Sequence, residues 1–366
     1  MNDPSIPTLA DALLSWFDRT RRDLPWRQNR TPYRVWLAEI MLQQTQVQTA
    51  IPYYERFLSR FPTLADLAQA DEQAVLKLWE GLGYYSRARN LLAAARQVMR
   101  EDNGQLPCDF KALRALPGIG DYTAGAILSL ACGQQAAAVD GNVVRVLARW
   151  SGTAWSAKSL QDRRQAADFV LTHMPAGRPG DFNEALMDLG ATVCLPREPR
   201  CPACPLAGGC QAYCRNLTAA LPLRDKSPDV PTERRLLLLI AAPGFWHVRQ
   251  RPPRGLLAGL FTFDWLAPDQ DPRAFRTWLQ GQDNVLVQPL PSLTHRFSHL
   301  AWHVDALRLG LPRADLGELA AWLETDGPQP DGRWAGRQEL QQLPFPAAVD
   351  QYRRQELDEP PKTASP

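Results

Sequence analysis

The sequence predicts a multidomain protein in which an all-α N-terminal region is followed by a smaller α+β domain. Residues 8–217 repeat apolar residues at helical spacing and contain few strand signals. Residues 235–350 contain continuous apolar runs of strand length. Between them, residues 218–234 carry three prolines among charged and small residues, which is typical of an extended linker. The length of 366 residues fits two or three such domains.

Composition indicates a soluble globular protein, with 45% hydrophobic and 22% charged residues. The N-terminus lacks the features of a signal peptide, and no apolar run is long enough to span a membrane. We therefore expect a cytoplasmic protein. A formal charge of +2 is too small to indicate a nucleic-acid partner. A DNA-binding surface would therefore have to be formed by local clusters of basic residues. Three clusters are candidates, although solvated helix faces give the same pattern: residues 19–22, Arg87 with Arg89, and Arg145 with Arg149.

Each element is expected from local signals. In the first region, caps and apolar spacing predict helices over residues 72–80, 86–100, 121–131 and 140–150. In the second region, apolar runs predict strands over 235–242, 255–265 and 284–290, and helical spacing predicts a helix over 314–324. A disordered tail is expected over residues 351–366.

Glu39 is the one charged residue in the otherwise apolar segment 35–42, which Thr31 and Pro32 introduce as a helix start. A helix without a polar face is buried, and burial raises the pKa of a lone carboxyl towards the range of a general acid. The alternative is an ion pair between Glu39 and an arginine such as Arg22 or Arg27.

Asp140 precedes the apolar helix 140–150, where a helix N-cap is the commonest role of an aspartate. Paired with Glu39, however, it offers an ionised carboxylate beside a neutral one. Two carboxyls whose pKa values are pushed apart cleave glycosidic bonds, and the N-glycosidic bond of a nucleoside is one such bond.

The turn Gly118-Ile119-Gly120 lies between Leu116-Pro117 and a helix that begins with Asp121. Backbone N–H groups at such a turn and at a helix N-terminus bind anions. The whole pattern indicates a helix–hairpin–helix that holds a DNA phosphate at Gly118 and Gly120.

Four cysteines occur within 17 residues, at Cys194, Cys201, Cys204 and Cys210. Without a signal peptide, such density favours metal binding over disulfides. Their spacing contains one Cys-x2-Cys pair and suits zinc or a [4Fe–4S] cluster equally well. The other three cysteines, Cys108, Cys132 and Cys214, are expected to be ordinary thiols.

Taken together, the motifs resemble the MutY family of adenine DNA glycosylases, in the helix–hairpin–helix glycosylase superfamily. The matching segments are VWLAEIMLQQTQV, WEGLGYYSRARNL, LPGIGDYTAGAI, VDGNVVRVLAR, NEALMDLGATVC and the cysteine loop. The resemblance is dense over residues 8–217 and thinner at 254–263 and 293–302. It implies a six-helix module over about 25–135 and an iron–sulfur module made of the N-terminal helix and about 136–217, whose four cysteines hold a [4Fe–4S] cluster.

The resemblance also implies a function: excision of adenine mispaired with 8-oxoguanine or guanine in duplex DNA, by a monomer that initiates base excision repair near the nucleoid. Glu39 would protonate the flipped adenine at N7, and Asp140 would stabilise or covalently trap the sugar cation. Tyr122 and Asn142 would orient Asp140 and the sugar. Related bifunctional enzymes such as endonuclease III carry a lysine where Tyr122 stands, so a monofunctional glycosylase is expected here.

Further residues carry roles by the same resemblance. The adenine pocket would be lined by Leu24, Trp26, Arg27, Leu42, Val47 and Glu184. Contacts with the base stack and the lesion would come from Gln44, Thr45, Leu82, Tyr84, Phe297, Ser298 and His299. Leu82 and Tyr84 could each simply pack at a helix end, but the glycines around them favour a loop that exposes both side chains.

The second domain resembles the Nudix-like recognition domain of the family. The Glu-rich helix that a Nudix pyrophosphohydrolase needs is missing from the sequence, so lesion recognition rather than hydrolysis is expected. Two other functions remain open at this point. One is a bifunctional glycosylase/lyase of the endonuclease III type, and the other is a non-enzymatic iron–sulfur protein that binds DNA.

Overall fold

The computed structural model describes residues 8–223, 229–325 and 332–358, and the chain divides into two compact units. The first unit comprises Met1–Gln69 and Asn90–Ser227, and the second comprises Ala70–Arg89 and Pro228–Pro366. No helix in the described ranges is long and apolar enough to cross a membrane. The expected combination of an all-α region with an α+β domain is confirmed.

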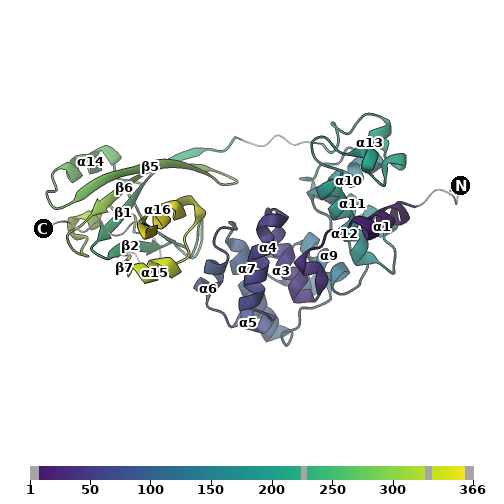
Figure 1. Cartoon of the computed structure of the whole chain (residues 1–366), viewed down its shortest axis with the longest axis horizontal. Helices are drawn as coiled ribbons and strands as arrows, with labels where there is room; N and C mark the ends of the chain where they lie inside the picture. Colours follow the sequence, from purple (N-terminus) through teal and green to yellow (C-terminus); the bar gives the residue numbers. More distant parts are fainter. Residues whose placement is uncertain (1–7, 224–228, 326–331, 359–366) are drawn as a thin grey trace. The chain divides into compact units, whose positions relative to one another are not determined.

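Helices make up the first unit (Figure 1). Their bounds are α1 Leu9–Thr20, α2 Pro25–Gln28, α3 Pro32–Leu42, α4 Val47–Arg60, α5 Leu64–Ala68, α7 Ser86–Glu101, α8 Phe110–Ala115, α9 Asp121–Leu130, α10 Gly141–Ser151, α11 Leu160–His173, α12 Pro179–Thr192 and α13 Gln211–Cys214. Two short 3₁₀ helices, η1 Cys201–Ala203 and η2 Ala207–Gly209, lie in the cysteine loop. Helix α7 continues into the second unit at its N-terminal end.

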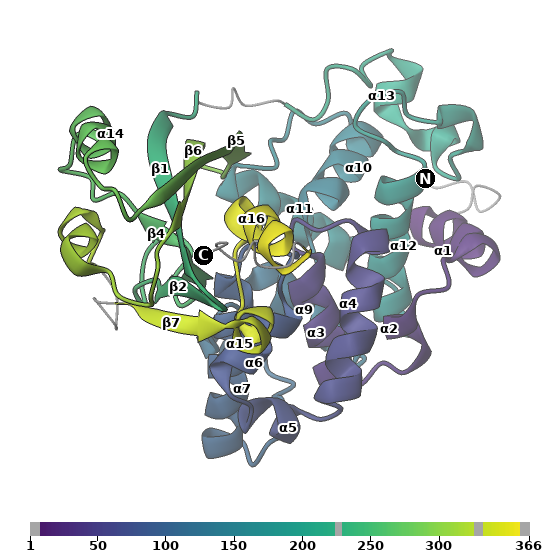
Figure 2. The same cartoon turned by 60° about the vertical axis from the view of Figure 1, so that its left-hand side comes forward.

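Helix α12 brings the parts of the first unit together. It packs against α1, α9 and α10, and α9 packs in turn against α3 (Figures 1 and 2). Apolar side chains of α1, α10, α11 and α12 form one continuous core. Side-chain caps fix the N-terminal ends of several helices, for example Thr31 on α3 and Asp140 on α10. Elements distant in sequence are thus held beside α9.

The second unit contains a seven-stranded mixed sheet in the order β3-β2-β1-β6-β5, with β4 against β1 and β7 against β2. The strands are β1 Thr232–Ala242, β2 Phe245–Gln250, β3 Phe261–Thr262, β4 Asp264–Trp265, β5 Leu286–Arg296, β6 Ala301–Gly310 and β7 Arg333–Gly336. Strands β1 and β6 are parallel, and the other pairs are antiparallel.

Both faces of this sheet are covered, which explains why β1 is apolar without alternation. Leu236, Leu238 and Ile240 face the core under α14 (Pro272–Gln280) and the 3₁₀ helix η3 (Gly317–Trp322). Leu237 and Leu239 face the other core, under α15 (Arg337–Gln342) and α16 (Ala347–Asp358). In Figure 2, α14 and α16 lie on opposite sides of the sheet.

A segment from the middle of the sequence packs with this unit. It contains α6 (Glu72–Leu78) and the loop that follows. Its Glu80 Oε1 accepts a hydrogen bond of 2.8 Å from Phe345 N and forms an ion pair of 3.0 Å with Arg353. The hydroxyl of Tyr85 donates to Phe345 O at 3.1 Å. Residues 70–89 therefore belong structurally with residues that follow them by more than 250 positions.

Three expectations about the second unit need correction. The segment 314–324 forms the 3₁₀ helix η3 instead of an α-helix. The segment 255–265 is extended only at its end, in β3 and β4, because its first part turns through the positive-φ residues Gly255, Leu257 and Gly259. The tail expected from residue 351 is helical as far as Asp358, since Tyr352 and Arg353 are buried, and residues 359–366 lie outside the described ranges.

Candidate active site

Glu39 lies in the interior of the first unit, on α3. Thr31 caps this helix, and most of its residues are buried, with Glu39 at 5% exposure. The Oε2 atom of Glu39 has no hydrogen-bond partner among the residues that the structure describes. Burial raises the pKa of Glu39 to about 7, although a hydrogen bond from Tyr122 opposes the rise. The negative charge of Asp140 adds to it. A carboxyl with such a pKa can act as a general acid at neutral pH.

The arginines near Glu39 pair with other carboxylates. Arg22 binds Asp188 with an Nη2–Oδ1 distance of 2.5 Å, and Arg27 binds Asp188 with an Nη1–Oδ2 distance of 2.9 Å. Arg27 affects Glu39 only by its positive charge. This charge lowers the pKa of Glu39 by less than burial raises it. The alternative of an ion pair between Glu39 and Arg22 or Arg27 is therefore wrong.

Glu184 on α12 is held by two arginines, Arg27 of α2 and Arg30, which lies between α2 and α3. Arg30 Nη2 lies 2.5 Å from its Oε2, and Arg27 Nε lies 3.2 Å from its Oε1. Arg30 also pairs with Asp181 at 3.1 Å. Burial raises the pKa of Glu184, while the two arginines oppose the rise. Sequence reasoning missed Arg30, Asp181 and Asp188; the signal was the spacing of three and four residues between acids along α12.

Tyr122 joins Glu39 to the start of α9. Its side chain makes a hydrogen bond with Glu39, and its hydroxyl lies 3.8 Å from Sδ of Met187. Burial raises the pKa of Tyr122 well above its usual range, and the charges of Glu39 and Asp140 add to this effect. The phenol therefore keeps its proton and acts as a donor at any pH at which Glu39 titrates.

Asp140 is an N-cap, as the simpler alternative expected, and its carboxylate is also fixed in place. Oδ1 accepts from the backbone N–H groups of Asn142 at 2.9 Å and Val143 at 2.8 Å. Oδ2 accepts from Nδ2 of Asn142 at 2.8 Å. Three N–H donors at the start of α10 therefore fix the orientation of this carboxylate. The buried carboxyl of Glu39 lies near enough to sense its charge.

The segment that leads to Asp140 is anchored by Asn183, which is fully buried on α12. Its Nδ2 donates to Ala136 O at 2.8 Å, and its Oδ1 accepts from Ala138 N at 3.2 Å. On the other side, α9 approaches so closely that a Cβ on Gly125 would lie 2.0 Å from Ala137 O. The position of Asp140 is therefore set by packing as well as by its own helix.

Arg145 and Arg149 are buried, at 7% and 2% exposure, so neither belongs to a DNA-facing cluster. Arg145 donates to Asn142 Oδ1 at 2.8 Å and to Cys194 O at 2.8 Å. Arg149 donates to Leu195 O at 2.7 Å. Their expected role as basic surface residues is wrong: the backbone carbonyls of the cysteine loop need buried donors, and these two guanidinium groups supply them.

The four clustered cysteines line one cavity, together with apolar side chains that include Trp150 and Leu189. In the described part of the chain, no three His, Cys, Asp or Glu side chains converge closely enough to hold a single metal ion. Thiols placed around a cavity fit a cluster better than a tetrahedral zinc ion, whose ligands meet at one point. Burial raises the pKa of Cys204 to about 11, so a bound metal would be needed to hold it as thiolate.

The helix–hairpin–helix forms as expected from α8, the turn and α9. Gly118 has φ +78°, and a Cβ there would lie 2.8 Å from Cβ of Asn90, so the protein itself requires this glycine. Gly120 differs, because its φ is −90° and an added Cβ would meet no described atom within 4 Å. It is the N-cap of α9 without a side-chain cap, which leaves open space in front of the helix N-terminus.

The residues expected in the adenine pocket have mixed environments. Leu24 and Trp26 are buried, and Leu42 and Val47 are half-buried on or beside α3 and α4. Leu42 ends α3, the helix that carries Glu39, and Glu184 lies on α12. Trp26 and Arg27 lie on α2, which packs against α3.

The residues expected to enter the base stack share an unusual backbone. Gln44 in the first unit has φ +60°, and Tyr84 in the second has φ +47°, a region that side chains other than glycine rarely adopt. Tyr84 is 48% exposed. Leu82 is buried at 7% exposure, so the expectation that the loop exposes it is wrong. Arg87 explains the difference, because it lies under the loop and donates to Leu82 O at 3.1 Å.

Arg87 is itself 8% exposed, so the expected pair of basic surface residues with Arg89 is also wrong. Arg89 is half-buried and donates to Ala258 O. Of the three candidate basic clusters, the one at the end of α1 keeps exposed arginines, Arg19 and Arg21.

A cavity of about 650 Å³ in the second unit collects most of the residues expected to contact the lesion. Its lining includes Leu82, Tyr84, Phe297, Ser298 and His299. Sequence reasoning missed the contribution of residues 255–258, whose Leu257 has φ +59°. Gln44 and Thr45 belong to the first unit and are not among its lining residues.

Comparisons with known proteins identify both parts of the chain. The model of the HhH-GPD superfamily of base excision DNA repair proteins matches residues 37–169, and the NUDIX domain model matches residues 235–355. The first match contains Glu39, Tyr122 and Asp140. A solved thermostable thymine-DNA glycosylase is 33% identical, with a TM-score of 0.52 over 56% of this chain and 95% of its own.

Full-length relatives share both parts. An adenine DNA glycosylase of Mus musculus is 35% identical over 374 residues, which cover 85% of this chain and 73% of the relative. An adenine DNA glycosylase of Buchnera aphidicola subsp. Acyrthosiphon pisum is 33% identical over 303 residues, covering 82% of this chain and 86% of the relative. At this identity over most of both chains, the protein belongs to the adenine DNA glycosylase family.

Proposed function

We propose that this protein excises adenine mispaired with 8-oxoguanine or guanine in duplex DNA, as the first step of base excision repair. The observation that carries the proposal is the buried Glu39, whose pKa is raised to about 7 beside Tyr122 and the capped carboxylate of Asp140. A buried acid and a second carboxyl fixed by hydrogen bonds in one site suit cleavage of a glycosidic bond through an oxocarbenium-like sugar.

The reaction follows from these two carboxyls. Glu39 donates its proton to N7 of the flipped adenine, and the electron pair of the N-glycosidic bond leaves with the base. Asp140 stabilises the positive charge on the sugar or bonds to C1′. Water then adds to C1′, and its proton returns to the carboxylate of Glu39. Tyr122 and Asn142 orient the two carboxyls, consistent with their hydrogen bonds.

The enzyme is proposed to leave the DNA strand uncut. A lyase needs an amine that forms a Schiff base with the sugar. The position before Thr123 holds the phenol of Tyr122, which cannot form one.

Recognition of the mispair is assigned to residues from both units. Tyr84 and Gln44 would enter the base stack, and their left-handed backbones fit residues positioned for a function rather than for packing. Phe297, Ser298 and His299 would contact 8-oxoguanine in the cavity of the second unit. Leu82 would support the residues that enter the stack, and Thr45 would lie beside the 8-oxoguanine.

The four cysteines would hold a [4Fe–4S] cluster, which would stabilise the loop that Arg145 and Arg149 attach to α10. No chemical step requires it. The protein would act as a monomer in the cytoplasm, associated with the nucleoid.

A single-turnover glycosylase assay tests this function on duplexes with A:8-oxoguanine, A:G and A:C pairs. We expect adenine release from the first two pairs and loss of release in Glu39→Gln. Glu55→Gln, an exposed glutamate on α4, is the matched control and should retain the rate. Absence of adenine release by the unmodified protein would overturn the proposal. Borohydride trapping of a covalent DNA adduct would instead favour the lyase.

A further inference from the structure

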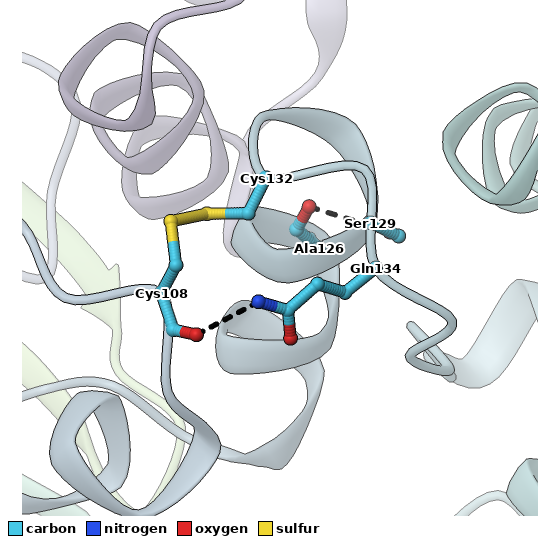
Figure 3. Close-up of a disulfide and its surroundings, with 5 residues drawn as sticks. All are labelled: Cys108, Ala126, Ser129, Cys132 and Gln134. Atoms are coloured by element: carbon cyan, nitrogen blue, oxygen red, sulfur yellow. Dashed lines mark hydrogen bonds between the residues drawn. A yellow bond between two sulfur atoms is a disulfide. The ribbon is translucent and has the colours of Figure 1, made fainter.

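The helix–hairpin–helix is closed by a disulfide that the sequence did not suggest. Cys108 lies directly before the cap of α8, Cys132 follows α9, and their Cα atoms are 6.0 Å apart (Figure 3). The expectation that both are ordinary thiols is wrong, because the fold brings together two residues 24 positions apart in the sequence. The closed loop contains α8, the turn with Gly118 and Gly120, and the whole of α9.

The first helix in this loop has little packing of its own. Helix α8 has six residues and buries one side chain, Leu113, while Phe110 is 43% exposed. So short a helix is not stable without tertiary support. Besides the disulfide, Gln134 Nε2 joins the two ends by donating to Cys108 O at 2.9 Å (Figure 3). The S–S bond therefore restrains the part of the hairpin that is held least by packing.

The same bond adjoins the route to the active site. Cys132 begins the segment that ends at Asp140, and Asn183 anchors this segment at Ala136 and Ala138. A restraint at Cys132 thus acts on the phosphate-binding turn and, through one connecting segment, on the candidate catalytic carboxylate.

The pair is accessible to small molecules. Cys108 is exposed and Cys132 is half-buried. Thiol–disulfide exchange requires access of an attacking thiolate to one sulfur, which this arrangement allows. In the cytoplasmic location proposed above, disulfides are usually transient and often serve redox sensing.

We propose that Cys108 and Cys132 form a redox-responsive dithiol–disulfide pair. Its oxidised state makes the helix–hairpin–helix more rigid and slows the dissociation of the protein from DNA. The co-reactants are low-molecular-weight thiols and their disulfides. For oxidation, the thiolate of Cys108 attacks a small disulfide and releases one thiol. The thiolate of Cys132 then attacks the mixed disulfide and releases the second thiol, so two electrons and two protons pass from the protein to the co-reactant.

The effect on DNA rests on the proposed function, whereas the effect on the hairpin does not. The test therefore has two readouts on the full-length, cluster-loaded protein, oxidised with a small disulfide or reduced with a dithiol. The first is hydrogen exchange of residues 109–121 without DNA. The second is the dissociation rate of a duplex that carries a stable abasic-site analogue. Thiol mapping by mass spectrometry establishes the state of each cysteine.

We expect reduction to raise exchange in residues 109–121 by roughly tenfold and to accelerate dissociation from DNA. The double variant Cys108→Ser/Cys132→Ser should resemble the reduced protein under both conditions. Cys214→Ser, which removes an exposed cysteine outside the pair, is the matched control and should respond like the unmodified protein.

Equal exchange in the oxidised and reduced proteins would overturn the proposal, as would a double variant that still responds. Unchanged DNA dissociation despite altered exchange would overturn its DNA-binding part. Adenine release by the oxidised protein is measured in parallel. Failure of the glycosylase proposal would appear there, independently of the exchange data.

Discussion

The carboxyl of Glu39 has a pKa of 4.5 as an isolated group and about 7 in the folded protein. Between these values, the folded protein binds more protons than the unfolded chain, so the free energy of unfolding decreases as pH rises through this window. Above pH 7 the ionised Glu39 lowers the free energy of unfolding by the full amount, about 3 kcal/mol for such a difference in pKa. Below the pKa of the unfolded chain, Glu39 is protonated in both states and has no such effect.

The same proton makes the activity pH-dependent. Because the protonated form of Glu39 is the proposed acid, the single-turnover rate of adenine release should fall about tenfold per pH unit above pH 7. Rates measured with saturating enzyme across this range check the prediction. A rate that stays constant to pH 9 would contradict the assignment of Glu39 as the acid.

Removal of the charge should stabilise the fold. Glu39→Gln is expected to raise the free energy of unfolding at pH 8 by up to about 3 kcal/mol and to leave it nearly unchanged at pH 4. Urea unfolding at both pH values measures this difference. Glu55→Gln serves as the control, because Glu55 is exposed. A variant less stable than the parent at pH 8 would show that the charged carboxylate is better solvated than its burial indicates.

Asn183 offers a second test at the scale of residues. Asn183→Ala should destabilise the protein by about 2–4 kcal/mol, since it leaves buried partners unsatisfied. It should also slow adenine release more than it weakens DNA binding, because it frees the segment before Asp140. Ser129→Ala removes one partner of Asn183 without freeing this segment, and should retain the rate. Equal losses of rate in both variants would assign Asn183 a purely structural role.

For single residues, the sequence predicts which side chains are buried better than it predicts which side chains pair with each other. The apolar neighbours of Glu39 are local, so its burial and raised pKa could be expected. Asp188 lies 166 residues from Arg22, and nothing local to either residue indicates their pairing. For the same reason, Arg145 and Arg149 could not be distinguished from surface residues before the cysteine loop was placed over them.

At the scale of elements, the two glycines of the hairpin make a contrasting pair. Gly120→Ala should leave stability unchanged, because its Cβ meets no described atom within 4 Å, but it should weaken DNA binding where a phosphate would approach. Gly118→Ala should destabilise by about 1–2 kcal/mol through its positive φ and the contact with Asn90. Thermal unfolding and DNA titration separate the two effects. Undiminished DNA affinity in Gly120→Ala would contradict a phosphate site at this turn.

The helices expected over residues 86–100, 121–131 and 140–150 agree within about two residues with the observed ends of α7, α9 and α10. Caps and glycines are local signals, which explains this agreement. The disulfide could not be predicted, because Cys108 and Cys132 meet only after α8 and α9 fold back on each other. The segment 314–324 lacks a cap that would distinguish an α-helix from the observed 3₁₀ helix.

At the scale of the whole molecule, the segment Ala70–Arg89 departs from the order of the sequence. It packs with the described residues that follow the linker, through contacts such as Lys77 Nζ to Leu343 O at 3.2 Å. The proline-rich linker predicts a domain boundary after residue 217, which would place this segment in the first domain. The sequence does not reveal its true unit, because the partners of Glu80 and Tyr85 lie beyond the linker.

Truncation after Ser227 should therefore expose a segment in the middle of the remaining chain. We expect a protease to cut within residues 70–89 at least roughly tenfold faster in the truncated protein than in the full chain. Mass spectrometry of early fragments locates the cuts, and cleavage elsewhere in the first unit provides the internal control. Equal cleavage in both proteins would show that this segment is stable without the second unit.

The burial of Glu39 also bears on laboratory evolution. A selection for heat resistance at alkaline pH would reward replacement of this carboxyl by a neutral isostere, since the fold gains stability when the charge is lost. Such a selection would enrich inactive proteins. Thermostable variants that still release adenine should therefore carry their gains at positions remote from α3.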